Sequence, residues 1–390
     1  MHIGFDISQT GSGKAGCGFF SHAMAQHLLC LAPEHRYSLY PSFGDFYFDP
    51  LMPVRNPYSG KEVHYGPRHF SRESARAFWN SGTLEHALRN PDVIHGNNFW
   101  CPTQLVKTKL VYTFHDMGFA VEPSWSTEAN RIGCFDGVFR SAAAADWIVA
   151  VSHASRRHYL EVFPHFPESR IRVIYQCSRF DDPSAEGNRP VALENIASGK
   201  FWLNVGTVEP RKNQRMLAEA YAKYLALGGE SMPLVLAGGK GWLMDDFHTH
   251  LHALGIAENV VMTGYVSDTE LVWLYRNCHA NLYPSLFEGF GLPVLEGMQF
   301  GAATMASNNS SLPEVGGDAA MLLDANDVDS WAHSMLVLSR DNPLRLNLKV
   351  KARERAEKFR WADSCSQLLS LYAEAASMPK RRAFWSADTV

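Results

Sequence analysis

The chain has few of the features that mark proteins stabilised by disulfides or by structural metal. Its 390 residues include only seven cysteines, an odd number, and none of them forms a C-x-x-C pair. They are scattered along the chain as Cys17, Cys30, Cys101, Cys134, Cys177, Cys278 and Cys365. This pattern predicts free thiols in a reducing compartment and argues against a disulfide framework or a zinc site.

Long apolar runs and a strong charge of one sign are also absent. No stretch of about 18 apolar residues exists, so no transmembrane helix is predicted. The chain opens as a strand, without a charged segment followed by an apolar core, so no secretory signal is predicted. Acidic residues number 40 and basic residues 36, a net charge of −4, whereas a general nucleic-acid binder would be strongly basic. We therefore expect a cytoplasmic protein without a nucleic-acid partner.

What is present is a repeated alternation of short apolar runs with amphipathic segments. The first half contains HIGFDI, YSLYPS, DVIHG, LVYTFHD, WIVAVS and IRVIYQ, and the second half contains FWLNVG, LVLAG, NVVMTG, ANLYPS, ATMAS and AMLLD. Such runs are typical of buried parallel strands connected by helices. The sequence predicts an α/β protein with two doubly wound Rossmann-like domains facing a cleft. The expected bounds are 1–180, a polar linker at 181–200, and 201–374, with 375–390 returning to the first domain.

The stretch GSGKAG, residues 11–16, matches the G-x-G-x-x-G fingerprint of dinucleotide-binding units. That fingerprint requires an acidic residue about 20 residues on, at the end of the second strand. Glu34 precedes that strand, and Asp45 follows it but lies farther along the chain than the fingerprint requires. An NAD-dependent oxidoreductase is therefore only a remote alternative, and Gly16 and Gly18 are interpreted instead as sites where backbone can approach a donor phosphate.

The stretch SLFEGFGLPVLEGM, residues 285–298, combines two carboxylates with a glycine-rich helix start. Glu288 lies in a loop after a predicted strand, and Glu296 lies about one turn into the following helix, which Pro293 begins. The exposed amides of such a helix start suit an anion. We expect phosphate contacts here, with Glu288 near sugar hydroxyls and Glu296 near a ribose.

A second stretch, NVGTVEPRKNQ, residues 204–214, places two cations after another strand. The strand ends at Gly206, and Arg211 and Lys212 come just before the next helix. Cations beside a helix start suit a diphosphate. Because both stretches follow strands of one sheet, we expect them at the same edge.

Together, GTVEPRKN and FEGFGLPVLEGM resemble the retaining, GT-B fold glycosyltransferases of family 4, which use nucleotide sugars. LVLAGG, VVMTGYVSDTEL, GAATMASNNSSLPEVGGDAAML and FRWADSC fit the same family, as do AGCG, TFHD and VSHASRRHY in the first half. The resemblance covers most of the chain and is patchy from 40 to 90.

The resemblance implies roles for individual residues. Glu296 would hold the donor ribose, Glu288 would lie by the donor sugar, and Arg211 and Lys212 would neutralise the diphosphate leaving group. His115 would project from the first domain, close to the reacting centre, although a histidine that closes a strand is also often structural. The remaining donor contacts would come from Gly206, Tyr265, Val266, Gly289, Phe290, Gly291 and Leu292.

Two further groups are candidates for the acceptor side. His95 and Asn97 end a strand and would meet the acceptor, at even odds with a structural role. Residues 61–79 carry Arg68, Arg72 and Arg76 among Tyr65, Phe70, Phe78 and Trp79, a basic and aromatic pattern that would suit peripheral contact with a membrane carrying a lipid-linked acceptor. A solvated helix face explains the pattern equally well.

No metal or other cofactor is expected. The chain has one D-x-D, Asp327 and Asp329, which follows a strand and opens a helix, so N-capping explains it. The expected activity is metal-independent, retaining transfer of a hexose, mannose favoured, from a nucleotide diphosphate sugar such as GDP-mannose to a saccharide or lipid-linked saccharide in polysaccharide biosynthesis. No residue can be identified from the sequence as a covalent nucleophile. This favours a front-face mechanism over a two-step mechanism with a covalent intermediate. UDP-sugar donors and a non-catalytic relative remain alternatives.

Overall fold

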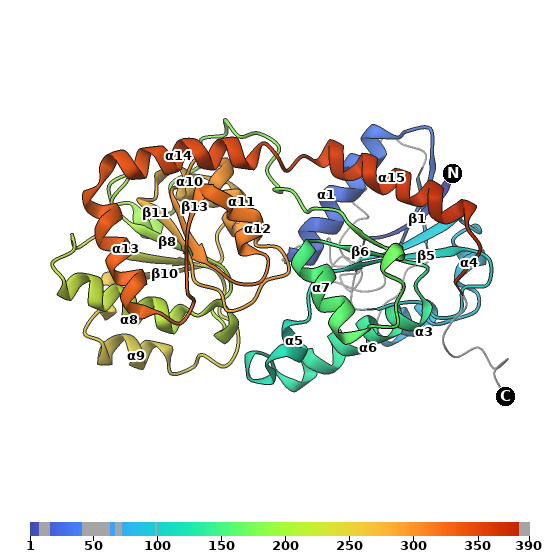
Figure 1. The fold of residues 1–390 in the computed structure, drawn as a ribbon, viewed down its shortest axis with the longest axis horizontal. Coiled ribbons are helices and arrows are strands. Elements are labelled where there is room, and N and C mark those ends of the chain that lie inside the picture. The colour runs from blue at the N-terminus through green and yellow to red at the C-terminus, as the bar shows by residue number, and fades with distance from the viewer. Residues whose placement is uncertain (8–15, 41–62, 67–71, 98–99, 382–390) are drawn as a thin grey trace. The chain divides into compact units, whose positions relative to one another are not determined.

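The computed structural model describes residues 1–7, 16–40, 63–66, 72–97 and 100–381. It divides into two compact units, each built on one parallel sheet. Unit 1 comprises 1–117, 129–179 and the chain from 360 onward, and unit 2 comprises 118–128 and 180–359. Figure 1 shows the two sheets with their helices.

The sheet of unit 1 has the strand order β3-β2-β1-β4-β5-β6-β7. Its strands are β1 (His2–Asp6), β2 (Arg36–Tyr40), β3 (Val63–Tyr65), β4 (Val93–Gly96), β5 (Lys109–Phe114), β6 (Trp147–Ala150) and β7 (Ile171–Val173). The central strands are buried along their whole length because helices cover both faces of a parallel sheet. The helices of this part of the chain are α1 (Gly16–Leu31), α3 (Arg72–Trp79), α4 (Leu84–Ala87), α6 (Glu128–Ala144), α7 (His153–Val162) and α15 (Trp361–Ser377).

The sheet of unit 2 repeats this order as β10-β9-β8-β11-β12-β13. Its strands are β8 (Trp202–Val205), β9 (Leu234–Ala237), β10 (Val260–Gly264), β11 (Ala280–Tyr283), β12 (Thr304–Ser307) and β13 (Ala320–Leu323). Its helices are α5 (Gly118–Val121), α8 (Gln214–Ala226), α9 (Phe247–Ala253), α10 (Asp268–Asn277), α11 (Leu292–Gln299), α12 (Leu312–Gly316), α13 (Val328–Arg340) and α14 (Asn342–Ala356), with short 3-10 turns η1 (Pro123–Trp125) and η4 (Pro210–Lys212).

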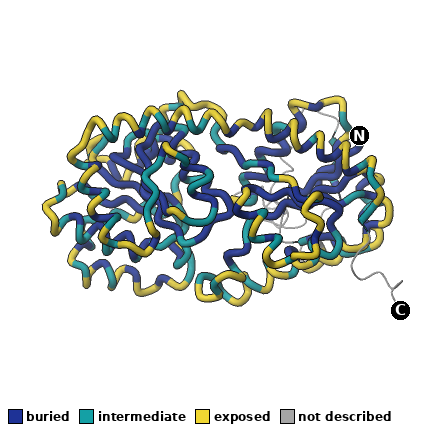
Figure 2. The backbone as a smooth tube through the Cα atoms, in the orientation of Figure 1, coloured by how far each residue is buried: buried dark blue, intermediate teal, exposed yellow. Residues whose placement is uncertain are grey.

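Two apolar cores in unit 2 explain why its sheet is buried on both faces, as the dark interior of Figure 2 shows. One core joins alternate strand residues to α8 and α13, with Trp202, Tyr221 and Trp331 at its centre. The other joins the opposite strand residues to α10, with Phe201 and Tyr275. Alternate residues of β8 thus face opposite cores, which is the period of two that a strand imposes.

The observed boundaries differ from the expected ones near 181–200 and near the C-terminus. Residues 181–200 pack on unit 2: Asn188 N–H donates to the Thr269 carbonyl, and Gly199 N–H donates to the Asn277 carbonyl. The helical tail is interrupted between α14 and α15, so unit 1 resumes at Arg360, earlier than the expected residue 375. An apolar face on α15, including Leu368, Leu371 and Tyr372, is buried, which explains its return to unit 1.

Candidate active site

The second sheet brings two loops together at one edge. β8 and β11 are neighbours and run parallel, so the loops that follow them, residues 206–213 and 284–291, leave the sheet at the same edge. The strand order reverses here, because β9 lies on one side of β8 and β11 on the other. Such a switch point is where ligands bind in doubly wound sheets.

The first loop takes a shape that only certain residues tolerate. Gly206 has φ 149°, and its carbonyl oxygen would lie 2.1 Å from a Cβ at Gly238. Arg211 and Lys212 lie in η4, and Asn213 adopts the left-handed conformation with φ 60° before α8 begins. The Asn213 side chain donates to the carbonyls of two other loops, at 3.2 and 2.7 Å. The cations are therefore held on a braced turn.

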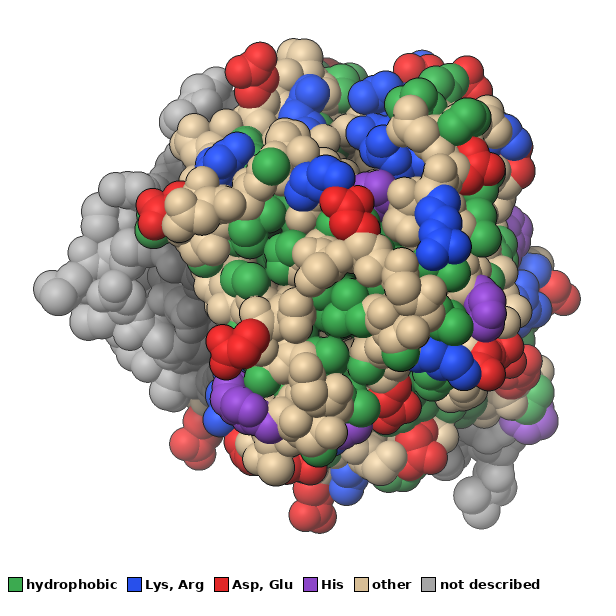
Figure 3. All heavy atoms as spheres, turned by 90° about the vertical axis from the view of Figure 1, so that its left-hand side faces the viewer, with side chains coloured by type: hydrophobic (Ala, Val, Ile, Leu, Met, Phe, Trp, Pro, Cys, Tyr) green, Lys and Arg blue, Asp and Glu red, His purple; other side chains and the backbone are tan. Residues whose placement is uncertain are grey.

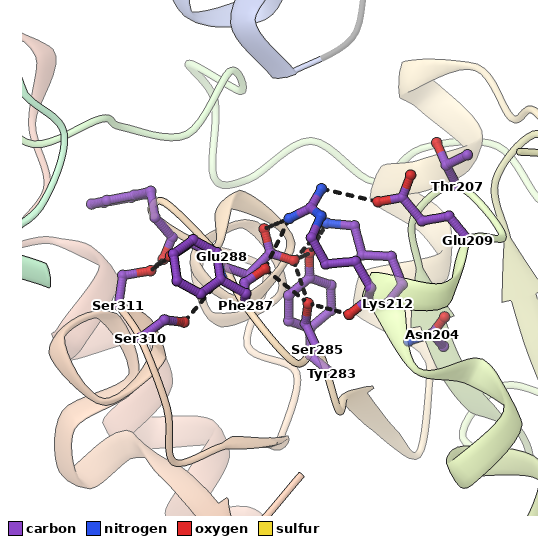
Figure 4. A network of polar contacts seen from close by, with 12 residues as sticks. Asn204, Thr207, Glu209, Lys212, Tyr283, Ser285, Phe287, Glu288, Ser310 and Ser311 are labelled. Atoms are coloured by element: carbon purple, nitrogen blue, oxygen red, sulfur yellow. Dashed lines mark hydrogen bonds and ion pairs between the residues drawn. The ribbon is translucent and has the colours of Figure 1, made fainter. Parts of the chain in front are cut away.

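Glu288 is the centre of a network that joins both loops (Figure 4). Its Oε1 accepts from Lys212 Nζ at 2.6 Å, and its Oε2 accepts from Arg211 Nη1 at 3.1 Å. Ser285 Oγ and the Tyr283 hydroxyl also donate to Oε1, at 2.7 and 2.9 Å. The structure thus brings together three predicted residues from stretches more than 70 positions apart.

Burial and the neighbouring positive charges shift the pKa of Glu288 in opposite directions. Its side chain is 9% exposed, against 13% for Lys212 and 22% for Arg211. Burial raises the pKa of the carboxyl, but the Lys212 and Arg211 charges and the hydrogen bonds from Lys212 and Ser285 outweigh it and lower the pKa to about 2. Glu288 is therefore ionised throughout the physiological pH range.

Two participants were missed by the sequence analysis. Glu209 is 2% exposed, and its Oε1 accepts from Arg211 Nη2 at 2.9 Å. The Tyr283 hydroxyl also accepts from Lys212 Nζ at 2.8 Å. Glu209 lies inside the stretch 204–214, and Tyr283 ends strand β11 just before the stretch 285–298. A carboxylate two positions before Arg211 was the available signal for Glu209, whereas nothing in the sequence pairs Tyr283 with Lys212.

The start of α11 has the predicted glycine–proline form. Gly291 precedes the helix with φ 108°, and Leu292 and Pro293 begin it. Glu296 lies on its second turn, is 1% exposed, and accepts from the Tyr275 hydroxyl at 3.2 Å. The Phe290 carbonyl is already occupied, since Ser311 Oγ donates to it at 2.7 Å.

Other predicted donor residues lie at the same edge of the sheet. Gly289 is buried beside Glu288. Tyr265 and Val266 follow β10, with Tyr265 68% exposed and Val266 packed on a core. Their contacts with a donor remain predictions.

His115, in unit 1, uses both ring nitrogens. Its Nε2 lies 3.1 Å from the Asn97 carbonyl oxygen, and its Nδ1 lies 3.0 Å from the side-chain amide of Gln176. Burial lowers the pKa of His115, but the neighbouring Cys17 side chain, the Asn97 carbonyl and Asp116 outweigh it, so that the pKa is raised. The ring orientation is fixed by these partners, and a catalytic role remains a prediction.

An acceptor contact and a structural role were equally expected for His95 and Asn97, and the structure buries both side chains. Both are 0% exposed. His95 lies between the Tyr372 hydroxyl and Thr113 Oγ1. Its burial, and to a lesser degree the nearby His115, lower the pKa of His95 to about 3. Asn97 donates to the Asp6 carbonyl at 2.9 Å. These hydrogen bonds support the structural role, and an acceptor contact remains a prediction.

Part of the basic and aromatic pattern of residues 61–79 belongs to the core or to ion pairs, and membrane contact through it remains a prediction. Trp79 is 1% exposed and packs on Tyr40, so it belongs to the core. Arg76 donates to Asp136 at 3.0 Å, and residues 63–65 form strand β3. Arg68 and Phe70 lie outside the described residues.

The glycines of the first loop are only partly described. Gly11 and Gly13 lie outside the described residues. Gly16 opens α1 with nothing within 4 Å of a Cβ placed there, and Gly18 is buried.

Asp327 has the predicted capping role. It precedes α13 and accepts from the Ser330 N–H at 3.0 Å, while Asp329 pairs with Lys223. In the part of the chain that the structure describes, no three His, Cys, Asp or Glu side chains are grouped so as to hold a metal ion. None of the described helices is long and apolar enough to cross a membrane.

Two doubly wound units of the same strand order place the chain in the GT-B class of proteins, and the second unit carries a carboxylate–cation cluster at its switch point. The chain matches the model of glycosyl transferases group 1 over residues 192–355 and that of glycosyltransferase family 4 over residues 29–177. It belongs to this glycosyltransferase family and is an enzyme of that class. The NAD-dependent alternative is thereby set aside.

Two curated relatives are mannosyltransferases of Escherichia coli. O-antigen chain mannosyltransferase B is 32% identical over 72% of this chain and 74% of its own length. Serotype-specific mannosyltransferase WbdA is 26% identical over 93% of this chain but only 47% of its own length. The chain thus spans about half of WbdA.

Solved structures show the same fold at low identity. HepE of Anabaena, in complex with UDP and glucose, has a TM-score of 0.70 at 17% identity, over 96% of this chain and all of that one. Sucrose-phosphate synthase of Thermosynechococcus elongatus has a TM-score of 0.72, also at 17% identity, over 96% of this chain and 98% of that one. At this identity the likeness concerns the fold alone.

Proposed function

We propose that the chain transfers a hexose, with mannose favoured, from a nucleotide diphosphate sugar to a saccharide or lipid-linked saccharide acceptor. The observation that carries the proposal is the cluster of Glu288 with Arg211 and Lys212 at the switch point of unit 2, with Glu296 on the next helix. The cations match a diphosphate, and the two carboxylates match hydroxyl groups of a sugar and a ribose.

GDP-mannose is the proposed donor. The mannosyltransferase relatives in polysaccharide assembly support mannose. A UDP-sugar is the alternative, because the fold neighbour HepE was solved with UDP and glucose. Thermal shifts with GDP, UDP and ADP separate these donors, since the preferred nucleotide stabilises the fold most at equal concentration.

The proposed reaction retains the anomeric configuration and needs no metal. The bond from the anomeric carbon to the diphosphate oxygen breaks while the acceptor oxygen bonds to the same face of that carbon. The acceptor hydroxyl proton passes to the departing phosphate oxygen, and Arg211 and Lys212 stabilise its developing charge. Glu288 is already held by both cations and two hydroxyls, which argues against its acting as a covalent nucleophile.

The test is donor turnover with purified protein. Activity is measured as the release of GDP from GDP-mannose in the presence of acceptor. NMR of the new glycosidic bond gives the stereochemistry of the product. Activity in the presence of EDTA tests metal independence. Arg211→Ala and Lys212→Ala should each lower kcat by about 100-fold, the scale for removing one stabiliser of developing charge, with little change in acceptor KM. A kcat near wild type would refute this assignment, and an inverted product would refute retention.

We also propose that the protein is cytoplasmic and contacts the inner face of the membrane through unit 1. Exposed apolar residues on α6 support this: Ile132, Phe135 and Phe139, at helical spacing, are 64%, 47% and 38% exposed. The face of the molecule in Figure 3 has acidic and basic side chains interspersed, with hydrophobic side chains between them. Co-sedimentation with anionic vesicles, lost in Phe135→Asp, is the expected result; no binding by wild type at low salt would refute membrane contact.

A further inference from the structure

Each of the two glutamates of the site is bonded to the hydroxyl of a buried tyrosine. The Tyr283 hydroxyl donates to Glu288 Oε1 at 2.9 Å, and the Tyr275 hydroxyl donates to Glu296 Oε2 at 3.2 Å. The tyrosines are 1% and 0% exposed. The same interval of eight positions separates the two tyrosines and the two glutamates. Each carboxylate is thus held by a rigid side chain from the core.

Tyr283 connects the acid to one of its cations. Its hydroxyl accepts from Lys212 Nζ at 2.8 Å while it donates to Glu288. Nζ also lies 5.3 Å from the centre of the Tyr283 ring. Since Tyr283 is the last residue of β11, the sheet itself fixes the hydroxyl. Burial and the Glu288 charge raise the pKa of Tyr283 well above its usual value, so the hydroxyl keeps its proton.

Tyr275 holds the other carboxylate from a different element. It lies on α10, and its ring stacks on Phe300 with centroids 6.3 Å apart and planes 12° apart. Phe300 ends α11, the helix that carries Glu296. The stacked ring and the hydroxyl therefore tie α10 to both ends of the segment from Glu296 to Phe300.

We propose that Tyr283 and Tyr275 are positioning residues, each setting one glutamate of the site. This rests on the proposed function, in which Glu288 lies by the transferred sugar and Glu296 by the ribose. Tyr283 then fixes Glu288 and Lys212 where charge develops, and its loss slows turnover. Tyr275 fixes the group that binds the nucleotide, and its loss weakens donor binding.

The experiment compares Tyr283→Phe, Tyr275→Phe and Tyr221→Phe. The last is the matched control, because Tyr221 is also 0% exposed and donates its hydroxyl to the Met232 carbonyl, within the core of the same unit. Loss of one oriented hydrogen bond corresponds to about tenfold. Tyr283→Phe should lower kcat about tenfold with donor KM within twofold. Tyr275→Phe should raise donor KM and the Kd of the nucleoside diphosphate about tenfold, with kcat within twofold.

The outcomes separate this inference from the proposed function. If kcat, donor KM and nucleotide Kd of both variants match those of Tyr221→Phe, the tyrosines only stabilise the fold and the inference is wrong. If wild type turns over no donor, the proposed function fails, but two readouts still decide the inference. These are the nucleotide Kd of Tyr275→Phe and, for Tyr283→Phe, the pH at which acid destabilises the protein. That pH should rise, because Glu288 loses a donor to its ionised form; an unchanged acid midpoint would overturn the role of Tyr283.

Discussion

The four charged side chains of the site cancel one another. Arg211 and Lys212 face Glu209 and Glu288, and all four are at most 22% exposed. An arriving diphosphate therefore meets cations that are already paired. To gain their full attraction it must draw at least one cation away from a carboxylate.

The first prediction concerns the pH range over which Glu288 stabilises the protein. Its pKa is about 2 in the folded protein, against an ordinary value of 4.5. A lowered pKa contributes stability that is fully present above the unfolded value and is lost as pH falls toward the folded one. Glu288→Gln should therefore be less stable than wild type above pH 5, by about 3 kcal/mol, because Lys212 and Arg211 each lose a charged partner in a largely buried site, although Glu209 still pairs with Arg211. The difference should shrink between pH 4.5 and pH 2.

Urea unfolding of both proteins at several pH values measures this difference. Glu230→Gln is the control, since Glu230 forms a more exposed pair with Lys200, which contributes little. A stability difference between wild type and Glu288→Gln that is constant down to pH 3 would contradict the assignment.

At the scale of elements, both functional loops depend on glycine or asparagine in backbone conformations that other residues resist. Gly291 combines φ 108° with a close neighbour, because a Cβ there would lie 2.6 Å from Leu312 Cδ2. The turn at Gly291 sets where the amides of α11 and the carboxylate of Glu296 point.

Gly291→Ala should therefore impair the site more than it impairs the fold. The strained φ costs about 1 kcal/mol, and displacing Leu312 moves the start of α11, so donor KM should rise by at least fivefold. Gly255→Ala is the matched control, with φ 69° but open space around its Cβ. It should lose similar stability and keep the kinetics of wild type. Equal donor KM values in the two variants would contradict the role of this turn.

The elements were predictable to the extent that local pattern determines them. Twelve strands of the two sheets follow from apolar runs, and α11 has the expected start. Strand β3 was missed because VHY is short, polar at its centre and only half-buried. The sequence left the acceptor and structural roles of His95 open, because its strand-end position does not reveal the bond to Tyr372, 277 residues away. The pairing of Arg211, Lys212 and Glu288 could be foreseen only because parallel neighbouring strands share an edge.

At the scale of the whole molecule, neither unit is a continuous piece of chain. Unit 1 is assembled from three segments, and the last of them begins only at Arg360. This segment is integral to the core of unit 1: Trp361 Nε1 donates to the Ser178 carbonyl, and the Tyr372 hydroxyl bonds His95. The return was expected for residues 375–390, but its start at Arg360 was not, because a helix that follows a Rossmann-like array has the same pattern whichever unit it covers.

The end of the described chain closes unit 1 through Arg381. Its guanidinium donates to the carbonyls of Ala142, Ala143 and Ala145, at 2.6 to 2.7 Å, where α6 ends. These are carbonyls that a helix leaves without partners of its own.

Arg381→Ala should lower the free energy of unfolding of unit 1 by about 2 kcal/mol and speed hydrogen exchange in α6, with hydrogen exchange in α8 and α13 of unit 2 unchanged. Arg360→Ala, which removes only an exposed ion pair with Asp363, is the control and should change neither. If exchange in α6 stays at the wild-type rate in Arg381→Ala, the C-terminal segment does not hold this helix, and the first unit is stable without it.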